Sequence, residues 1–393
     1  MTDIVILSAT RTPLGAFQGA FASTPAARLG AAAIKGAVTQ AGVNPHDVTD
    51  CLMGNVLQAG QGQAPARQAA LYAGLPQSVR CVTVHKVCGS GMQTVMGAAH
   101  FLAGGMGTIA VAGGMENMSL APYLLPKARD GYRIGHQQVI DSMISDGLWD
   151  PYNNLHMGSC AEQCAAKYHF TRAQQDAYAI ESFKRANAAQ KDGRFAAEIT
   201  PVELTDAKGN VTKVEHDEGP AKVKYDKIPS LKPSFQKDGT ITPANASSIN
   251  DGAAALVLAT AATALARGLK PIARLAGFGG HAQDPVWFTT APVQAAQSAL
   301  KAAGWTADMV DLWEVNEAFA VVPMAFAQEL HVPAEKLNVR GGAISLGHPI
   351  GCSGARILVT LIAALKERGL KRGVAAICIG GGEGLAACVE LLN

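Results

Sequence analysis

The cysteine at position 88 has surroundings that suit a nucleophile. It lies in the string VHKVCGSGM, where a strand-like run over residues 81–87 ends and a Gly-Ser-Gly turn opens an alanine-rich helix. The unpaired amides and the dipole at a helix N-terminus stabilise a thiolate and lower its pKa, and glycines let a substrate approach the backbone closely. Cys88 is therefore a candidate nucleophile, and a buried structural cysteine is the alternative that this string leaves open.

Three more side chains could complete a site around such a thiol. A histidine is the usual base for a cysteine nucleophile, and His348 lies in GGAISLGHPIGCSG between a glycine and a proline. Cys378, in AAICIGGGEG, precedes glycines whose amides could bind an oxyanion. Asn316, in WEVNEAFA, ends a strand-like run, where a side-chain amide can hold a water or polarise a carbonyl. Each of these residues taken alone is also compatible with a structural role.

An internal repeat relates the surroundings of these residues. The string AAIKGAVTQAGVNPHDVTDCLMGNV resembles AAQSALKAAGWTADMVDLWEVNEA at an offset of about 262 residues. Nearly the same offset carries the segment that begins at Cys88 onto the region of CSGARILVTLIAALKERGLKRGVAAICIGGG. The repeat therefore brings the His348 turn to the place in the second half that matches the Cys88 turn in the first.

The elements around these turns alternate between strand and helix. Residues 4–7 are apolar and precede Pro13, which predicts a buried strand, and apolar residues at helical spacing predict a helix over 26–41 with Gly42 as its C-terminal cap. Two such β/α halves predict two mostly parallel sheets, covered by helices and packed on one another. We assign residues 1–118 and 250–270 to the first half, 271–393 to the second, and the more polar residues 119–249 to an inserted loop domain.

Composition excludes several classes of partner. The chain has 393 residues, 48% of them hydrophobic, with 16% charged and a net charge of +2, which favours a large packed core and homo-oligomers. No stretch combines basic and aromatic residues as a nucleic-acid groove would, and no apolar run reaches the roughly 18 residues that span a membrane. The opening MTDIVILSATRTP lacks the features of a signal peptide and ELLN is not a peroxisomal address, so we expect a cytoplasmic protein.

The eight cysteines are expected to be free thiols, because a chain of this size needs no disulfide scaffold. Cys160 and Cys164 form a CxxxC pair, but no second pair of ligands at zinc spacing accompanies it. We therefore expect structural cysteines at these two positions and no metal site.

Seven strings, taken together, resemble the thiolases, and the match runs in order along essentially the whole chain: VCGSGM, GGMENMS, HMGSCAEQ, ANASSINDGAA, NEAFA, GGAISLGHPIGCSGARI and CIGGGEG. The resemblance implies a duplicated α/β fold with five alternating layers (αβαβα) and an inserted loop domain. It also implies a homo-oligomer, expected here to be a homotetramer built as a dimer of dimers.

The resemblance assigns roles to the candidate residues. Cys88 would be the nucleophile that takes the acyl group, His348 its base, and Cys378 the acid/base at the substrate's α-carbon. Asn316 and His348 would hold the enolate, and the amides of Cys88 and Gly380 the tetrahedral thioester intermediate. The implied activity is that of an acetyl-CoA C-acetyltransferase, which reversibly condenses two acetyl-CoA to acetoacetyl-CoA and CoA through an acetyl-cysteine. Because the CoA thioesters are substrates, no metal or resident cofactor is implied.

The coenzyme A and acyl contacts carry over one by one, to Ser247, His156, Met157, Phe235, Ala318 and Phe319. The His156-Met157 pair resembles the short-chain type. Three strings depart from the family pattern: DEGPA replaces DE-x-x-R, WFTTAP replaces MG-x-GP, and His85 replaces an asparagine. We therefore put forward Lys222 or Lys224 as the substitute for the missing arginine near the nucleotide phosphates.

Three other readings remain open. A broad-range 3-ketoacyl-CoA thiolase of fatty-acid degradation would differ only in the size of its acyl pocket. A decarboxylating condensing enzyme would be expected to carry a second histidine where Cys378 stands. A non-catalytic acyl-CoA-binding protein would need none of Cys88, His348 and Cys378, and would show no hyper-reactive thiol that acetyl-CoA protects.

Overall fold

The computed structural model describes residues 3–206 and 208–392, and its centre is one mixed sheet. Within these residues the strands follow the order β14-β15-β16-β13-β1-β12-β5-β3-β4, and β2 pairs with β12. Their bounds are β1 (Ile4–Arg11), β2 (Gly15–Ala16), β3 (Asp50–Gly54), β4 (Arg80–Val84), β5 (Ile109–Asn117), β12 (Asn250–Thr260), β13 (Ala273–Ala282), β14 (Leu312–Val315), β15 (Arg372–Ile379) and β16 (Glu383–Leu391).

The prediction of two separate, mostly parallel sheets is wrong in two respects. The two halves are joined by a short pairing of β1 with β13, where Val5 lies opposite Arg274. Among the named strands in the described part of the chain, only the pairs β3 with β4, β3 with β5 and β14 with β15 are parallel. The glycines after Cys378 explain part of the difference, because Gly381 and Gly382 have φ of 90° and 85° and turn the chain straight from β15 into β16. A tight hairpin joins only antiparallel strands.

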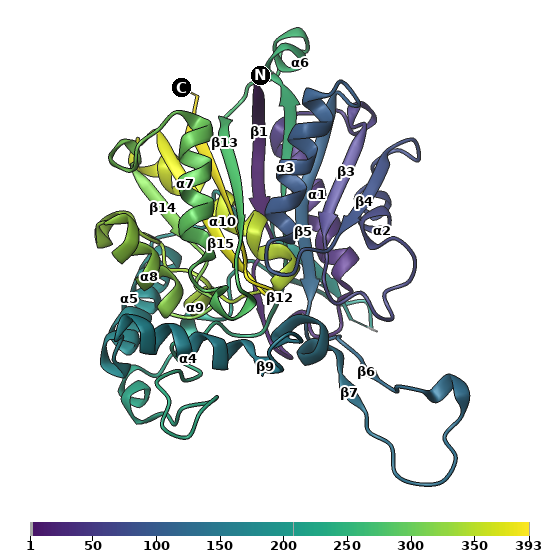
Figure 1. Ribbon diagram of the computed structural model, residues 1–393. Coiled ribbons are helices and arrows are strands. Elements are labelled where there is room, and N and C mark those ends of the chain that lie inside the picture. Colours follow the sequence, from purple (N-terminus) through teal and green to yellow (C-terminus); the bar gives the residue numbers. More distant parts are fainter. Residues whose placement is uncertain (1–2, 207, 393) are drawn as a thin grey trace.

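Helices cover the strands in layers, as Figure 1 shows. Helices α1 (Ala26–Ala41) and α2 (Pro65–Tyr72) pack on the outer face of the first half, and α7 (Ala291–Ala303) packs on that of the second. Helices α3 (Ser90–Ala103) and α10 (Ile350–Arg368) pack against each other and contact strands of both halves. The order is therefore helix, strand, helix, strand, helix, which confirms the predicted five layers. Helix α10 is buried on almost every side, which explains why its sequence is apolar all round.

The internal repeat is visible in the helix ends. Helix α1 stops at Gly42 (φ 64°) and α7 stops at Gly304 (φ 70°), both left-handed caps whose amides bond back to the last turn. The predicted bounds 26–41 are those observed, and the predicted strand at residues 4–7 is the start of β1. Helices α3 and α10 occupy matching places in the two halves and each begins at a turn that carries a candidate catalytic residue.

The chain leaves the sheet after β5 and returns in β12, where Asp251 pairs with Asn117. Much of the segment between them forms a layer below the sheet in Figure 1, with a long arm that runs out from β6 and β7. Val202, Leu204 and Val214 instead pack into the same apolar cluster as α1. The helices and strands here are β6 (Tyr123–Leu124), β7 (Ile140–Asp141), β8 (Trp149–Asp150), β9 (Leu155–His156), α4 (Met157–Tyr168), α5 (Arg172–Lys191), β10 (Val202–Thr205) and β11 (Val211–Val214). The assignment of 119–249 to a separate domain stays an interpretation.

Three short helices complete the fold: α6 (Ala261–Ala266), α8 (Val321–Leu330) and α9 (Ala343–Leu346). Among residues 3–206 and 208–392 we find no helix that is both long and apolar enough to cross a bilayer. The eight cysteines are free thiols, and Cys160 and Cys164 are buried on α4.

Candidate active site

One cavity of about 220 Å³ brings most of the predicted site residues together. It opens between the ends of the central helices and the inserted segment. Its walls include Cys88, His348, Gly380, Ser247, His156, Met157, Phe235, Ala318 and Phe319, which come from positions far apart in the sequence. Of the residues predicted for catalysis and acyl binding, Cys378 and Asn316 are not part of this wall, and neither are the predicted phosphate contacts Lys222 and Lys224. Further wall residues that the sequence did not single out include Met118, Leu148, Phe288 and Ile350.

A strained turn presents Cys88 to the cavity. Strand β4 ends at Val84, earlier than the predicted residue 87, because the chain must turn before the helix. Val87 has φ of 43°, a conformation that costs a β-branched residue about 1–3 kcal/mol. The hydroxyl of Ser90 accepts from the Lys86 amide at 2.8 Å and donates to the Val87 carbonyl at 2.6 Å, which holds the turn. Cys88 therefore lies just before the first turn of α3.

The electrostatic setting of Cys88 differs from the prediction. Burial raises the pKa of the Cys88 thiol to about 12, and hydrogen bonds from the amides of Gly380 and of Cys88 itself lower it only in part. The expected net lowering by the helix N-terminus is therefore wrong, because desolvation outweighs it. The thiol is protonated at rest and needs a base when it attacks. The two amides nevertheless hydrogen-bond to the Cys88 sulfur, so they lie close to where the oxyanion would form on a carbonyl that this sulfur attacks.

His348 is held as a neutral ring. Its Nδ1 lies 2.6 Å from the Ser353 hydroxyl oxygen, and that hydroxyl in turn donates to the Pro349 carbonyl at 2.9 Å. Since the hydroxyl has a single hydrogen, we assign the ring proton to Nδ1, which leaves Nε2 as an acceptor. Burial, and then the positive charge of Arg356, lower the pKa of His348 to about 3. The His348 ring is therefore neutral at rest and becomes protonated only when a reacting group transfers a proton to it.

Asn316 and Cys378 are buried and are not part of the cavity wall. Asn316 follows the last residue of β14, and its Nδ2 lies 3.5 Å from His348 Nε2. The Oδ1 atom of Asn316 is buried and has no hydrogen-bond partner in the described part of the chain. Cys378 lies in β15 and is wholly buried; burial and then the nearby charge of Cys88 raise its pKa well above the ordinary value. The two thiols are therefore close enough to influence each other's ionisation.

Aromatic rings form one part of the cavity wall. The rings of His156 and Phe235 stack with their centroids 4.7 Å apart, and Phe319 meets both Phe235 and Phe288 edge to face. His156 caps helix α4, since its Nδ1 accepts from the Gly158 amide at 3.1 Å. This fixes the imidazole against the wall. The cavity is therefore narrow and apolar beyond the reactive groups.

Ser247 and the residues after Asn316 are tied together. The Ser247 amide donates to the Ala318 carbonyl at 2.9 Å, so two predicted contacts for coenzyme A share one backbone hydrogen bond. Beyond Ser248 and Ile249, a second cavity of about 610 Å³ adjoins the first. Lys222, Lys224 and Lys227 lie along it.

Sequence reasoning missed two residues that organise the site. Ser353 lies in the GHPIGCSG string, five residues after the histidine that it contacts, so its position in the same turn was the available signal. Glu116 is wholly buried and accepts from the amides of Val56 and Gly351 at 3.0 and 2.9 Å. It connects the end of β5 to the first turn of α10. Burial raises the pKa of Glu116 to about 7, although four hydrogen bonds to its carboxylate oppose that shift.

The arrangement defines an acyl-transferring enzyme with a cysteine nucleophile. Comparisons with known proteins agree: the family description "Thiolase, N-terminal domain" matches residues 4–262 and "Thiolase, C-terminal domain" matches residues 269–391. The chain belongs to the thiolase family, and it is an acyltransferase.

Individual relatives are similar over their full length. The chain is 52% identical to acetyl-CoA acetyltransferase 2 of Arabidopsis thaliana, over 99% of this chain and 97% of that protein. It is 50% identical to an acetyl-CoA acetyltransferase of Cupriavidus necator, over 99% and 100%. Among solved structures, a Bacillus anthracis acetyl-CoA acetyltransferase superposes with a TM-score of 0.97 at 39% identity, covering 100% of this chain and 99% of that one. An Ascaris suum thiolase in complex with coenzyme A superposes with a TM-score of 0.94 at 42% identity, covering 99% of this chain and 100% of that one.

Proposed function

We propose that this protein is an acetyl-CoA C-acetyltransferase that condenses two acetyl-CoA to acetoacetyl-CoA and CoA, and that it also catalyses the reverse thiolysis. The observation that carries the proposal is the small apolar cavity in which Cys88, His348 and Gly380 meet. The relatives named above support the substrate.

The first half of the reaction acetylates Cys88. His348 Nε2 takes the thiol proton, and the sulfur attacks the thioester carbonyl of acetyl-CoA. The amides of Cys88 and Gly380, which already point at the sulfur, stabilise the oxyanion. When the carbon–sulfur bond to CoA breaks, the leaving thiolate takes the proton of Cys378. The site then holds acetyl-Cys88, a protonated His348 and a Cys378 thiolate.

The second half forms the carbon–carbon bond. The Cys378 thiolate removes the α-proton of a second acetyl-CoA, and His348 Nε2–H and the Asn316 side-chain amide hold the enolate oxygen; these two groups lie 3.5 Å apart. The enolate carbon attacks the carbonyl carbon of acetyl-Cys88, and the bond from that carbon to the Cys88 sulfur then breaks. Acetoacetyl-CoA leaves, and His348 returns its proton to the Cys88 sulfur. An acetylated Cys88 cannot carry a charge, so the Cys88 thiolate that would raise the pKa of Cys378 is absent at the step that needs the Cys378 thiolate.

Acyl length separates this proposal from a broad-range 3-ketoacyl-CoA thiolase. The rings of Phe235, Phe288 and Phe319 limit the space beyond the reactive groups, which favours short acyl chains. The test compares cleavage of acetoacetyl-CoA by free CoA with cleavage of a C6 3-ketoacyl-CoA, with Cys88→Ala as the control. Cleavage of acetoacetyl-CoA alone supports the proposal, comparable C6 turnover favours the broad-range enzyme, and no turnover with either substrate favours an acyl-CoA-binding protein.

The second cavity is our candidate for the nucleotide end of coenzyme A. Lys222 and Lys224 lie along it, and it adjoins the active-site cavity at Ser248 and Ile249. We expect Lys222→Ala/Lys224→Ala to raise the Michaelis constant for CoA several-fold at low salt, because two cations near the phosphates are lost. Lys213→Ala, an exposed lysine outside this cavity, is the matched control. An unchanged Michaelis constant in the double variant contradicts the assignment.

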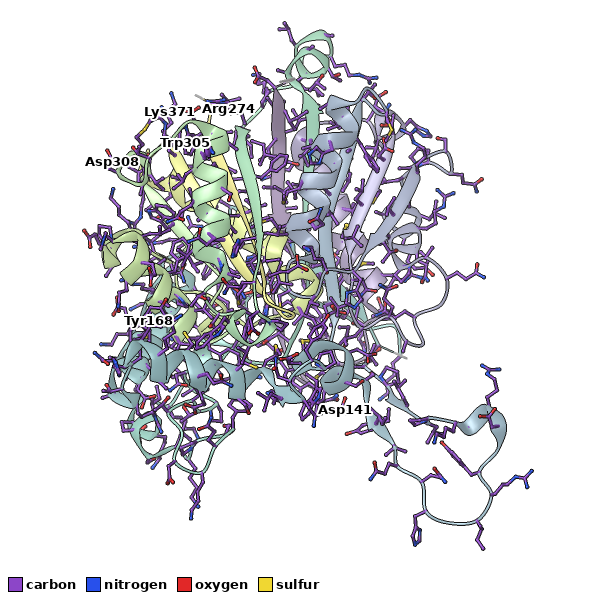
Figure 2. All side chains as sticks on the ribbon, in the orientation of Figure 1. Asp141, Tyr168, Arg274, Trp305, Asp308 and Lys371 are labelled. Carbon is purple, nitrogen blue, oxygen red and sulfur yellow. The ribbon has the colours of Figure 1, made fainter. Side chains whose placement is uncertain are left out.

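We also propose the homotetramer expected from the sequence. The arm between β6 and β7, whose base is marked by Asp141 in Figure 2, extends away from the body. It exposes large apolar side chains, with Ile134 at 99% and Tyr123 at 66%. Such surface is costly in water unless another subunit covers it. Light scattering should show a tetramer for the wild type and a smaller species for Ile134→Asp, while Leu265→Asp, on the exposed helix α6, stays tetrameric. A tetrameric Ile134→Asp would contradict the role of the arm.

A place in fatty-acid metabolism follows from the proposed substrates. The cytoplasmic location expected from the sequence stays a prediction, which fractionation of the source cells would test.

A further inference from the structure

Two cysteines outside the active site lie side by side in the sheet. Cys51 on β3 and Cys81 on β4 are direct partners in a parallel pairing. Both point to the face that α2 covers, since Thr83, two residues after Cys81, accepts from the Ala66 amide at the start of that helix. Neighbouring strands lie about 4.8 Å apart, and disulfides join Cα atoms about 4.4–6.8 Å apart. The backbone therefore already holds the pair at bonding separation.

Arg67 on α2 completes a cluster around the more accessible thiol. Its Nη1 donates to the Val79 carbonyl at 2.5 Å, and the Cys81 sulfur also lies 3.7 Å from that oxygen. The guanidinium and the sulfur therefore share one acceptor. Cys81 is partly exposed, whereas Cys51 is buried.

The ionisation of the two thiols is uneven. The pKa of Cys81 is lowered to about 7, chiefly by a hydrogen bond from Cys51 and further by Arg67, against the opposing effects of burial and Asp50. The pKa of Cys51 is raised well above its ordinary value by the same hydrogen bond and by burial. Sensor thiols that oxidants attack share this pattern of an acidic, accessible sulfur beside a second thiol.

We propose that Cys81 and Cys51 form a peroxide-reactive thiol pair, in which Cys81 attacks the oxidant and Cys51 resolves the product to a disulfide. The Cys81 thiolate displaces hydroxide from hydrogen peroxide and becomes a sulfenic acid. The Cys51 thiol then attacks that sulfur and water leaves. In total, two thiols and one peroxide give one disulfide and two waters, and two electrons pass from the sulfurs to the peroxide.

This pair is separate from the catalytic thiols. Cys88 follows β4 by four residues, but burial keeps it protonated at rest, so it is the poorer target for peroxide. A lowered pKa increases the fraction of Cys81 that is thiolate at pH 7, although a less basic thiolate is also a weaker nucleophile. We expect Cys81 to react faster in the folded protein than in the urea-unfolded chain.

The test treats the full-length protein with hydrogen peroxide at pH 7, blocks free thiols with N-ethylmaleimide, and digests it with trypsin without reduction. The chain cleaves into peptides 36–67 and 81–86, each with one cysteine, so the disulfide gives one linked species of defined mass. Cys51→Ser should stop at a sulfenic acid on Cys81 that dimedone captures, and Cys81→Ser should leave Cys51 reduced. Arg67→Gln should slow formation several-fold, with peptide 36–80 in place of 36–67 in the linked species because a tryptic site is lost, and Arg67→Lys should restore part of the rate.

Two results would overturn the proposal. The first is oxidation of peptide 87–127, which carries Cys88, with no linked species. The second is a linked species that forms at equal rates in folded and unfolded protein, since the fold would then contribute nothing. Because neither cysteine touches the active-site cavity, Cys51→Ser and Cys81→Ser should both keep wild-type turnover of acetoacetyl-CoA before oxidation.

Discussion

His348 Nδ1 lies 2.6 Å from Ser353 Oγ, and this contact joins the proposed base to the first turn of helix α10. The serine hydroxyl is fixed in turn by the Pro349 carbonyl at 2.9 Å. The ring is therefore oriented by the helix that lies between the two halves of the molecule. Its free Nε2 is turned to Asn316.

Replacing Ser353 by alanine should lower kcat about 10- to 100-fold, since the lost hydrogen bond of about 1–3 kcal/mol holds both the ring and its tautomer. The Michaelis constant should change little, because Ser353 does not line the cavity. Steady-state rates of acetoacetyl-CoA thiolysis measured from pH 6 to 9 would show the fall and a displaced pH profile.

Thr360→Val is the matched control, because Thr360 is buried on the same helix but bonds to Glu198. It should cost stability and leave the pH profile unchanged. Wild-type turnover in Ser353→Ala would show that another group sets the tautomer of His348.

Much of the site could be predicted because its chemistry lies in contiguous strings. Cys88, His348 and Cys378 each stand at a glycine turn between a strand and a helix or a second strand, and periodicity locates such turns. The helix at residues 26–41 was predicted to the residue, since its cap, Gly42, has an unambiguous signal.

Properties that depend on the surroundings in space could not be predicted. The pKa of Cys88 depends on desolvation by residues distant in sequence, so the helix N-terminus alone gave the wrong direction. The pairing of β1 with β13 and the hairpin after Cys378 depend on strand direction, on which apolar runs carry no information. The contact between Cys51 and Cys81 depends on strand register for the same reason.

Gly380→Ala should reduce activity without unfolding the protein. An added Cβ would meet Met157 at 3.4 Å, an ordinary contact, and Gly380 is not among the residues with positive φ. The methyl group would nevertheless enter the cavity beside Cys88, so we expect a lower kcat/KM for acetoacetyl-CoA and an unchanged melting temperature.

Gly382→Ala is the comparison that distinguishes a loss of activity from a loss of stability. It has φ of 85°, and its Cβ would lie 2.3 Å from the Gln283 carbonyl oxygen, so this variant should lose stability as well. Thermal melts and kinetics on both variants make the comparison, and wild-type kinetics in Gly380→Ala would place the thioester away from this residue.

Acid should weaken the fold through His348. Its pKa is lowered from 6.5 in the unfolded chain to about 3 in the folded protein. Between about pH 6.5 and pH 3, the unfolded chain therefore binds a proton at His348 that the folded protein does not bind. The free energy of unfolding consequently falls as the pH drops below about 6.5. From pH 7 to 5 this site should contribute about 2 kcal/mol of the loss, at about 1.4 kcal/mol per pH unit.

Urea unfolding of the wild type and of His348→Asn at pH 7 and pH 5 checks this prediction. The variant should lose about 2 kcal/mol less on acidification, whatever its stability at pH 7. Equal losses in the two proteins would mean that the folded ring is protonated as easily as the unfolded one.

Arg11→Met should destabilise the protein by about 3–5 kcal/mol, because it leaves buried carboxylates without their cationic partner. The Arg11 guanidinium is wholly buried and contacts Glu198 at 2.7 Å and both oxygens of Asp217, at 2.7 and 2.9 Å. Asp217 also accepts from the Leu14 amide at 2.8 Å and belongs to the DEGPA string just before Lys222. The same variant should therefore raise the Michaelis constant for CoA if Lys222 contacts the nucleotide.

Urea unfolding at one fixed protein concentration measures the stability of Arg11→Met. The double variant Arg11→Met/Asp217→Asn should recover part of the lost stability, since it removes one of the two unpaired buried charges. If the stability of Arg11→Met lies within about 1 kcal/mol of wild type, water must reach these carboxylates.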